Sequence, residues 1–209
     1  MIVKNYMLKR EDLLVLDVSQ RIQDALNLIV ADGHLSLPVV EGDLFKGCLS
    51  IYYIYKKYYE KEETDRAAFL NSYVGDHYRK DIPTLSAKNV VEDASILFSR
   101  ENIPFVPVVN KEEHLLGIVT QKSIFQSFNK LMGYGSGVRL TIYTPDVKGR
   151  ISRLAKAIKK GDGNIISLAI NDPESKLGVK EIILRLDGGN IDKIKGYIEK
   201  EGFKIIEIE

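Results

Sequence analysis

The sequence has few of the residues that covalent and metal-dependent chemistry requires. Cys48 is its single cysteine, so no disulfide can form within the chain, and its place in an apolar run predicts a small buried side chain. The histidines His34, His77 and His114 are scattered, and none has a neighbour at metal-ligand spacing. We therefore expect no metal site and a reducing, cytoplasmic location.

Long apolar runs and an excess of one charge are also missing. No run approaches the roughly 20 apolar residues that span a bilayer, and residues 1–7 lack the apolar core of a signal peptide. The chain has 30 Lys and Arg against 29 Asp and Glu, so no broad field attracts nucleic acid or an anionic membrane. We expect neither of these as a partner.

Patterns of catalytic residues are absent as well. We find no nucleophile–base pair, no carboxylate dyad and no Walker-type loop. Residues 133–137 read Gly-Tyr-Gly-Ser-Gly, but a predicted strand follows them and none precedes them, so they indicate a linker rather than a phosphate loop. The sequence predicts a protein without enzymatic activity and without a required cofactor.

The feature that organises the chain is an internal repeat. Residues 37–40 read Leu-Pro-Val-Val and residues 106–109 read Val-Pro-Val-Val. Each is followed by a glycine, two apolar residues and a hydroxyl: Gly-Cys-Leu-Ser at 47–50 and Gly-Ile-Val-Thr at 117–120. Because a repeat defines the unit of folding, the pattern predicts two small modules of the order strand–helix–strand–strand–helix.

The apolar patterns place these elements along the chain. The first module is predicted to have strands over 13–16, 35–40 and 44–50 and helices over 22–30 and 51–61. The second is predicted to have strands over 82–85, 105–109 and 115–120 and helices over 90–100 and 121–131. After the linker, strands over 138–143, 165–170, 179–186 and 203–208 and helices over 151–158 and 191–198 predict a ferredoxin-like unit.

These motifs resemble known families. Residues 1–132 resemble a tandem pair of cystathionine-β-synthase (CBS) domains, the Bateman module, through the duplicated Pro-Val-Val and Gly-x-x-Ser/Thr signatures. Residues 138–209 resemble an ACT domain through their topology and through Thr144–Gly149, which is similar to the family's Asp-x-x-Gly loop. The order of the domains resembles that of the acetoin utilisation protein B family.

The expected fold is therefore α+β. Two CBS domains, each βαββα, form a pseudo-symmetric pair, and a ferredoxin-like βαββαβ ACT domain follows. The predicted boundaries are 1–62 for the first CBS domain, 63–76 for a helical connector, 77–132 for the second CBS domain, 133–137 for the linker and 138–209 for the ACT domain.

The resemblance implies two clefts between the CBS domains that bind an adenosine-type ligand. One cleft combines the first-domain residues Leu16, His34, Leu35 and Ser36 with Thr120 and Ser123. The other combines Thr84, Ile103, Pro104 and Phe105 with Ser50 and Tyr53. Helices begin just past Ser50 and Thr120, and free N–H groups at a helix start favour phosphate.

The chain departs from the family at one position of each cleft. Its nucleotide binders usually carry Asp three residues after the Ser or Thr, whereas this chain has Tyr53 and Ser123. A carboxylate orients ribose hydroxyls more strongly than one hydroxyl does. The departure weakens the case for AMP or ATP and leaves a cyclic dinucleotide, a nucleoside-containing metabolite or an empty pair as alternatives.

Simpler roles compete with each candidate residue. Ser50 and Thr120 are also good helix caps, and the tyrosine-rich segment 52–59 is more typical of a packed helix than of a single-strand binder. The ACT resemblance implies that Asp146, Gly149 and Asn164 receive an amino-acid-type ligand, although Asp146 is equally suited to capping the following helix.

The leading functional prediction is a regulatory, non-catalytic sensor. It binds an adenine-containing nucleotide or nucleoside metabolite in the CBS pair, with amino-acid-type sensing by the ACT domain, and it forms a homodimer. One alternative is an interaction and dimerisation module with empty clefts that docks on a metabolic enzyme. The other is an enzyme that turns over a nucleotide.

Overall fold

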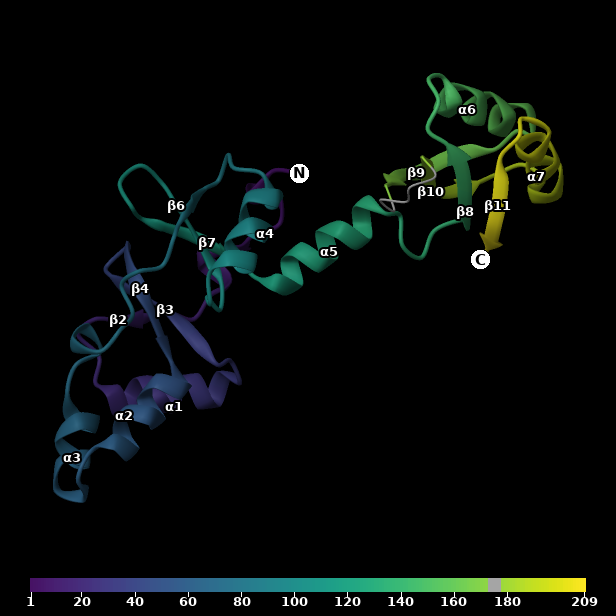
Figure 1. Ribbon diagram of the computed structural model, residues 1–209. Helices are drawn as coiled ribbons and strands as arrows, with labels where there is room; N and C mark the ends of the chain where they lie inside the picture. Colours follow the sequence, from purple (N-terminus) through teal and green to yellow (C-terminus); the bar gives the residue numbers. More distant parts are fainter. Residues whose placement is uncertain (173–177) are drawn as a thin grey trace. The chain divides into compact units, whose positions relative to one another are not determined.

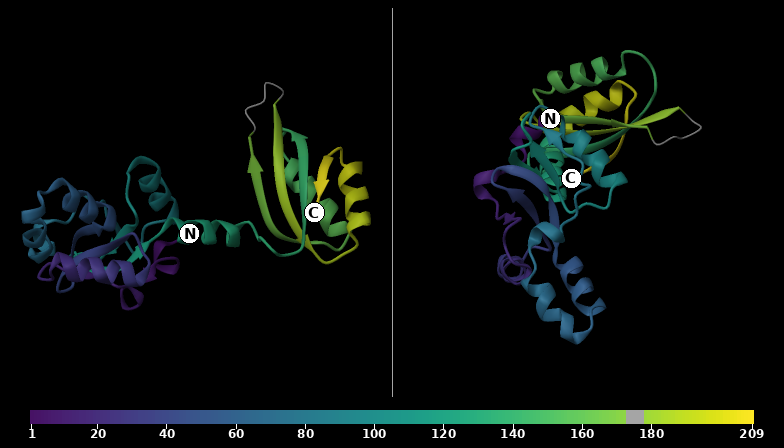
Figure 2. Two further views of the ribbon diagram at one scale, coloured as in Figure 1. Left: turned by 90° about the horizontal axis from the view of Figure 1, so that it is seen from below. Right: turned by 90° about the vertical axis from the view of Figure 1, so that its left-hand side faces the viewer.

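The computed structural model describes residues 1–172 and 178–209 (Figure 1). The chain divides into two compact units, Met1–Ser127 and Phe128–Glu209. Both units are mixed α+β, as predicted (Figures 1 and 2). Among the described residues, no helix has the length and apolar character needed to cross a membrane.

The first repeat forms a three-stranded sheet of order β2-β3-β4. Its elements are β2 (Leu16–Asp17), α1 (Ile22–Asp32), β3 (Ser36–Glu41), β4 (Leu44–Ser50) and α2 (Ile51–Glu60). Ile22, Ala25 and Ile29 form the buried face of α1, and Gly33 ends the helix in the left-handed conformation at φ 76°. The residues predicted as a connector contain α3 (Glu63–Asn71) and η3 (Val74–Asp76).

The second repeat has the same order with one added strand. Its elements are β5 (Leu85–Ser86), α4 (Val91–Arg100), β6 (Val106–Val109), β7 (Leu115–Val119) and α5 (Gln121–Leu131), and the sheet order is β1-β7-β6-β5. The added strand β1 (Leu8–Lys9) comes from the start of the chain, between η1 (Val3–Asn5) and η2 (Arg10–Asp12). The duplicated hairpins confirm the predicted repeat.

The opening strand of each repeat was predicted wrongly. Strands were expected over 13–16 and 82–85, but the observed strands are Leu16–Asp17 and Leu85–Ser86. Each makes only two parallel pairs, Leu16 and Asp17 with β3 and Leu85 and Ser86 with β6. The apolar residues before them pack in the core or line a cavity and do not extend the ladder.

The two repeats are joined by reciprocal crossing segments. Leu8 and Lys9 of β1 pair with Ile118 and Gly117 of β7 in the second sheet. Conversely, the backbone of Arg79 exchanges two hydrogen bonds with Cys48 of β4, at 3.0 and 2.8 Å. The start of the chain therefore belongs to the sheet of the second repeat, although the predicted boundary assigned residues 1–62 to the first.

Both motif glycines lie where these segments cross. A Cβ at Gly47 would be 2.0 Å from the carbonyl oxygen of Arg79, and a Cβ at Gly117 would be 2.2 Å from that of Leu8. Backbone atoms cannot move aside as a flexible side chain can, so only glycine fits without displacing the crossing segment.

The second unit is a four-stranded antiparallel sheet of order β11-β8-β10-β9. Its elements are β8 (Val138–Pro145), α6 (Arg150–Lys160), β9 (Asn164–Asn171), β10 (Val179–Asp187), α7 (Ile191–Lys200) and β11 (Lys204–Ile208). Alternate strand residues such as Leu140, Ile142 and Ile182 pack with Leu154 and Ile194 of the helices. This is the predicted ferredoxin-like order.

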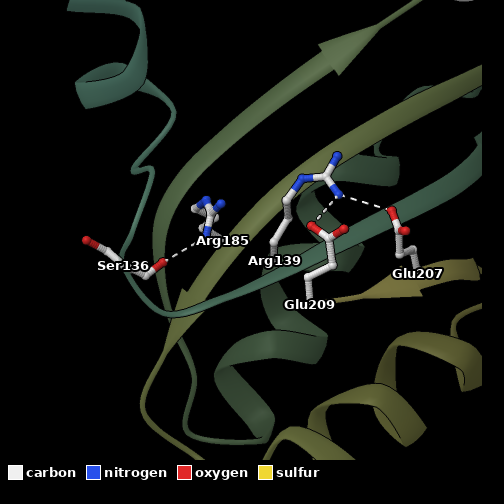
Figure 3. Close-up of polar contacts among 5 residues, drawn as sticks. All are labelled: Ser136, Arg139, Arg185, Glu207 and Glu209. Carbon is white, nitrogen blue, oxygen red and sulfur yellow. Dashed lines mark hydrogen bonds and ion pairs between the residues drawn. The ribbon is translucent and has the colours of Figure 1, made fainter. Parts of the chain in front are cut away.

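Polar contacts tie the segment before β8 and the end of the chain to this sheet (Figure 3). Arg139 of β8 lies between Glu207 and Glu209, with its Nη1 3.1 Å from a carboxylate oxygen of each. Arg185 of β10 donates to the carbonyl of Ser136 at 3.2 Å.

Candidate functional site

A cavity of about 480 Å³ lies between the two repeats, and we call it the Thr120 cavity. The first repeat supplies its wall at the end of α1 and the start of β3, the second repeat supplies Thr120 after β7, and the crossing segment supplies Leu8. The cavity is lined by Leu8, Asp12, Leu13, Leu14, Asp32, Gly33, His34, Leu35, Ser36, Leu37, Pro38, Pro104, Phe105, Ile118 and Thr120.

A second cavity of about 440 Å³, the Ser50 cavity, has the reciprocal arrangement. Here the second repeat supplies the wall before β6, and the first repeat supplies Ser50 at the end of β4. It is lined by Leu35, Ser36, Cys48, Leu49, Ser50, Tyr52, Tyr53, His77, Tyr78, Arg79, Asn102, Ile103 and Pro104. The two cavities share Leu35, Ser36 and Pro104, so these three residues form part of both walls.

Each motif hydroxyl caps the helix that follows it. Ser50 Oγ accepts a hydrogen bond from the backbone N–H of Tyr53 at 3.1 Å. Thr120 Oγ1 accepts one from the N–H of Ser123 at 3.1 Å and lies 3.0 Å from the Ser123 hydroxyl. Capping uses the acceptor side of the oxygen, so the O–H of Ser50 remains available to donate into its cavity.

Two further side chains determine the chemistry of the Ser50 cavity. Burial raises the pKa of the Cys48 thiol to about 11, against a smaller opposing effect of the Arg79 charge. Desolvation lowers the pKa of His77, whose Nε2 lies 2.7 Å from the Ser72 hydroxyl. The thiol is therefore protonated and the imidazole neutral at pH 7, which leaves Arg79 as the cation of this wall.

Most of the sequence-predicted residues line these cavities. His34, Leu35, Ser36 and Thr120 lie together in the Thr120 cavity. In the Ser50 cavity, Ser50, Tyr53, Ile103 and Pro104 lie together.

Four predicted residues lie elsewhere. Leu16 is fully buried in the core of the first repeat, where its side chain cannot reach a ligand. Ser123 is buried against Thr120 as part of the cap, and Thr84 lines a separate cavity of about 230 Å³ with Lys46 and Lys80. Phe105 lines the Thr120 cavity rather than the Ser50 cavity.

Residues at the start of the chain that the sequence did not predict also line a cavity: Leu8, Asp12 and Leu14 lie in the wall of the Thr120 cavity. Arg79, which the sequence places close enough to complement a phosphate, lines the Ser50 cavity. The motif glycines were a usable signal, because a glycine inside a strand often marks the close approach of another backbone.

In the second unit, a smaller cavity of about 180 Å³ lies at the loop between β8 and α6. Asp146 and Gly149 line it, together with Arg150 and Lys180. Asp146 lies 3.5 Å from Lys180, which also pairs with Asp172, and the pKa of Lys180 is raised mainly by that second carboxylate. Gly149 itself occupies the N-cap position of α6, so Asp146 does not cap this helix.

The structure does not bring Asn164 to this loop. Asn164 pairs with Asp187 at one end of the sheet, whereas Pro145, next to Asp146, pairs with Val179 at the other end. A strand rises about 3.3 Å per residue, so the length of β9 separates the two positions within one unit.

Family comparisons agree with both units. A model of the CBS domain family matches residues 74–130, and a model of the TTHA0829-like ACT domain matches residues 136–209. The fold is a CBS pair followed by an ACT domain.

Similar solved structures cover mainly CBS pairs. CBSX2 of Arabidopsis thaliana, solved in complex with AMP, is 24% identical with a TM-score of 0.54, over 61% of this chain and 95% of that one. CbpB in complex with c-di-AMP is 19% identical with a TM-score of 0.53, over 64% and 87%. A CBS pair/ACT domain protein of Thermotoga maritima is 18% identical with a TM-score of 0.50, over 61% and 96%.

One curated relative is a partial match. The glycine betaine/carnitine/choline transport ATP-binding protein OpuCA of Bacillus subtilis is 37% identical over 71 residues. The match covers 34% of this chain and 19% of that protein, so the likeness concerns one segment of each.

Proposed function

We propose that this chain is a regulatory sensor that binds an adenine-containing nucleotide or nucleoside in its CBS pair. The observation that carries the proposal is the reciprocal pair of cavities, each built from both repeats and each with a capped helix start in its wall. Their volumes fall within the roughly 300–1,000 Å³ of typical ligand pockets.

The walls suit a purine nucleoside. Leu35 and Pro104 supply apolar surface to both cavities. Phe105 adds an aromatic ring to the Thr120 cavity, and Tyr52, Tyr53 and Tyr78 add rings to the Ser50 cavity. Such surfaces accommodate the faces of a flat base, while backbone groups and hydroxyls near the helix starts can pair with polar edges. The AMP and c-di-AMP complexes of the similar CBS pairs support the same ligand class.

A sensor also requires two states with different ligand affinity. The crossing segments supply a route for such a change, because Leu8 and Arg79 are at once parts of a β-pairing between repeats and parts of a cavity wall. A bound ligand that displaces either segment would change the β-pairing between the two repeats.

We assign the protein a non-catalytic role in the cytoplasm. Among residues 1–172 and 178–209, no group of three or more His, Cys, Asp or Glu side chains could hold a metal ion. The order of domains supports a relationship to the acetoin utilisation protein B family, and the loop cavity at Asp146 and Gly149 supports an amino-acid-type ligand for the ACT domain.

Association is the second proposed role. Tyr52 and Tyr59 on α2 are 73% and 72% exposed, and Phe125 on α5 is 67% exposed. Large exposed aromatic side chains on packed helices favour a contact surface. We assign this surface to the contact between the two chains of a homodimer. If the clefts are empty, the alternative is that the surface docks on a metabolic enzyme.

A thermal-shift panel tests the sensor role. AMP, ATP, cyclic di-AMP, adenosine and S-adenosylmethionine would be added to the full chain, and a ligand at a hundredfold excess over its Kd should stabilise it by about 2.7 kcal/mol. Leu35→Ala should reduce the shift, since Leu35 is 75% exposed and lines both cavities, so its loss hardly affects folding.

Val30→Ala is the matched control, because Val30 is an exposed residue of α1 that lines neither cavity. If no compound shifts the melting temperature, the sensor role fails and the association role takes its place. A shift that Leu35→Ala and Val30→Ala leave equally intact would place the ligand outside these cavities. Release of product from a bound nucleotide would support the enzymatic alternative.

A further inference from the structure

The two cavities differ in the sign of their charged side chains. Among the described residues, Arg79 is the one Lys or Arg that lines the Ser50 cavity, and no carboxylate lines it. The Thr120 cavity is lined by the carboxylates of Asp12 and Asp32 and by His34, without Lys or Arg. Cavities that are related by the repeat therefore present opposite fields to a ligand.

Arg79 is held in position by its own contacts. Its backbone is paired with Cys48 of β4, two residues before Ser50, and its Nη1 donates to the carbonyl of Asn102 at 2.6 Å. A guanidinium has five N–H donors, so this contact leaves others for a ligand. Its charge lowers the pKa of the Cys48 thiol against the larger effect of burial, and Cys48 lines the same cavity.

The other titratable groups near the Ser50 cavity do not cancel this charge. His77 is neutral at pH 7, because desolvation lowers its pKa against a smaller opposing effect of Asp76. Lys57 lies 5.9 Å from the Tyr53 ring and is paired with Glu60, and Lys80 lies 5.5 Å from the Tyr78 ring. The helix start at Ser50 adds partial positive charge.

The Thr120 cavity has the opposite balance. The carboxylates of Asp12 and Asp32 line it, and the His34 ring nitrogen Nδ1 contacts a carboxylate oxygen of Asp32. Lys9 pairs with Glu11 at 3.2 Å, and Arg10 donates to the carbonyl of Leu13 at 3.4 Å. Lys122, two residues after Thr120, does not line this cavity. A phosphate placed here would face carboxylates of the same sign of charge. Their repulsion outweighs the attraction of the partial positive charge at the helix start.

We infer that the CBS pair separates its ligands by charge. The Ser50 cavity takes a phosphate-bearing adenine nucleotide through Arg79, and the Thr120 cavity takes an adenine nucleoside without phosphate that is neutral or cationic. This inference rests on the proposed sensor function and refines its ligand class. It makes the pair a detector of two compounds rather than two copies of one site.

Isothermal titration of the full chain with three matched probes tests this division. The probes are AMP, adenosine and 5′-amino-5′-deoxyadenosine, which differ at the 5′ position and carry negative, zero and positive charge at neutral pH. Arg79→Gln should weaken the binding of AMP about tenfold or more, since a hydrogen bond to the charged phosphate is lost. Arg79→Lys should retain most of the affinity, and adenosine should be little affected by either change.

Asp12→Asn tests the other cavity. This variant should weaken the binding of the aminonucleoside about threefold or more and leave the affinity for AMP unchanged. Arg100→Gln and Asp81→Asn are controls with the same changes of charge at exposed positions that line neither cavity. Circular dichroism of each variant verifies that the fold is retained.

The inference requires both results. It is overturned if Arg79→Gln binds AMP as tightly as Arg100→Gln does, or if Asp12→Asn weakens AMP or leaves the aminonucleoside unchanged. In those cases a bound nucleotide still upholds the sensor function. If none of the three probes binds the wild-type protein, the sensor function itself fails and the division of ligands fails with it.

Discussion

Replacing Gly117 with alanine should open the contact between β1 and β7 and leave the rest of the second sheet in place. The added Cβ would lie 2.2 Å from the Leu8 oxygen and 3.2 Å from its carbonyl carbon, whereas ordinary contacts begin near 3.4 Å. Both atoms belong to the backbone, so β1 must move away by about 1 Å.

The cost follows from what that movement breaks. Overpacking of this kind costs about 1–3 kcal/mol, and the weakened ladder between Leu8 and Ile118 adds roughly 0.5–1.5 kcal/mol per hydrogen bond lost. Gly117 does not have a positive φ, so backbone strain contributes nothing. We expect Gly117→Ala to lower the free energy of unfolding of the first unit by about 2–3 kcal/mol.

Hydrogen exchange followed by mass spectrometry gives the local measurement. In the wild type the amides of Val3 and Lys4 are bonded to the carbonyls of Asn89 and Ala87. In Gly117→Ala, residues 3–9 should exchange at least about tenfold faster, since each 1.4 kcal/mol of easier opening is one factor of ten. Gly47→Ala should instead expose the amides of Cys48 and Arg79.

Gly42→Ala is the control for this comparison. Gly42 has a φ of 62° and no atom within 4 Å of its added Cβ, so alanine costs only about 1 kcal/mol of left-handed strain. That variant should leave residues 3–9 protected. If Gly117→Ala also leaves them protected, or unfolds within 0.5 kcal/mol of the wild type, the glycine is not required by the crossing segment.

Three further outcomes follow from single residues. Because burial raises the pKa of Cys48 to about 11, iodoacetamide at pH 8 should label it only after urea unfolding, and labelling of the native chain would contradict its burial. The pKa of His77 is lowered below 6.5 in the folded state, so its contribution to the free energy of unfolding is present above pH 6.5 and is lost as the pH falls. His77→Gln should remove this pH-dependent loss of stability from urea-unfolding curves measured at several pH values. An unchanged pH dependence in the variant would contradict the lowered pKa. Gly196 lies inside α7 with no atom within 4 Å of an added Cβ, so Gly196→Ala should stabilise the second unit by about 0.5–1 kcal/mol in the same assay, and a loss of stability would refute this.

The elements that could be predicted from the sequence are those with a repeated or periodic pattern. The two hairpins follow from duplicated apolar strands, and residues 138–143 form part of the predicted strand β8. The expected alternation is only partly observed, because Thr141 is buried together with its neighbours Leu140 and Ile142. The crossing segments have no such pattern. β1 has two residues and Arg79 forms an isolated bridge, so neither contains enough residues to show periodicity.

The same limit explains the errors at the cavities. Ser36, Pro104, Ser50 and Thr120, which lie in or beside the repeated motifs, line the cavities. Leu16 was expected in a cleft because the CBS resemblance implies it, whereas the strand begins at Leu16 and the side chain is entirely buried. Which side chain faces a cavity depends on the register of pairing, and a two-residue strand gives no register signal.

The Gly-x-x-Ser/Thr motif can be explained without any ligand. Its glycine admits the crossing backbone of the other repeat, and its hydroxyl caps the next helix. Since folding alone requires both residues, their presence cannot determine which ligand binds. Selection must come from residues outside the motif, and the structure offers charged ones in Arg79 on one side and Asp12 and Asp32 on the other. Substitutions at these three residues should change ligand preference without unfolding the pair, whereas substitutions in the motif should affect stability first.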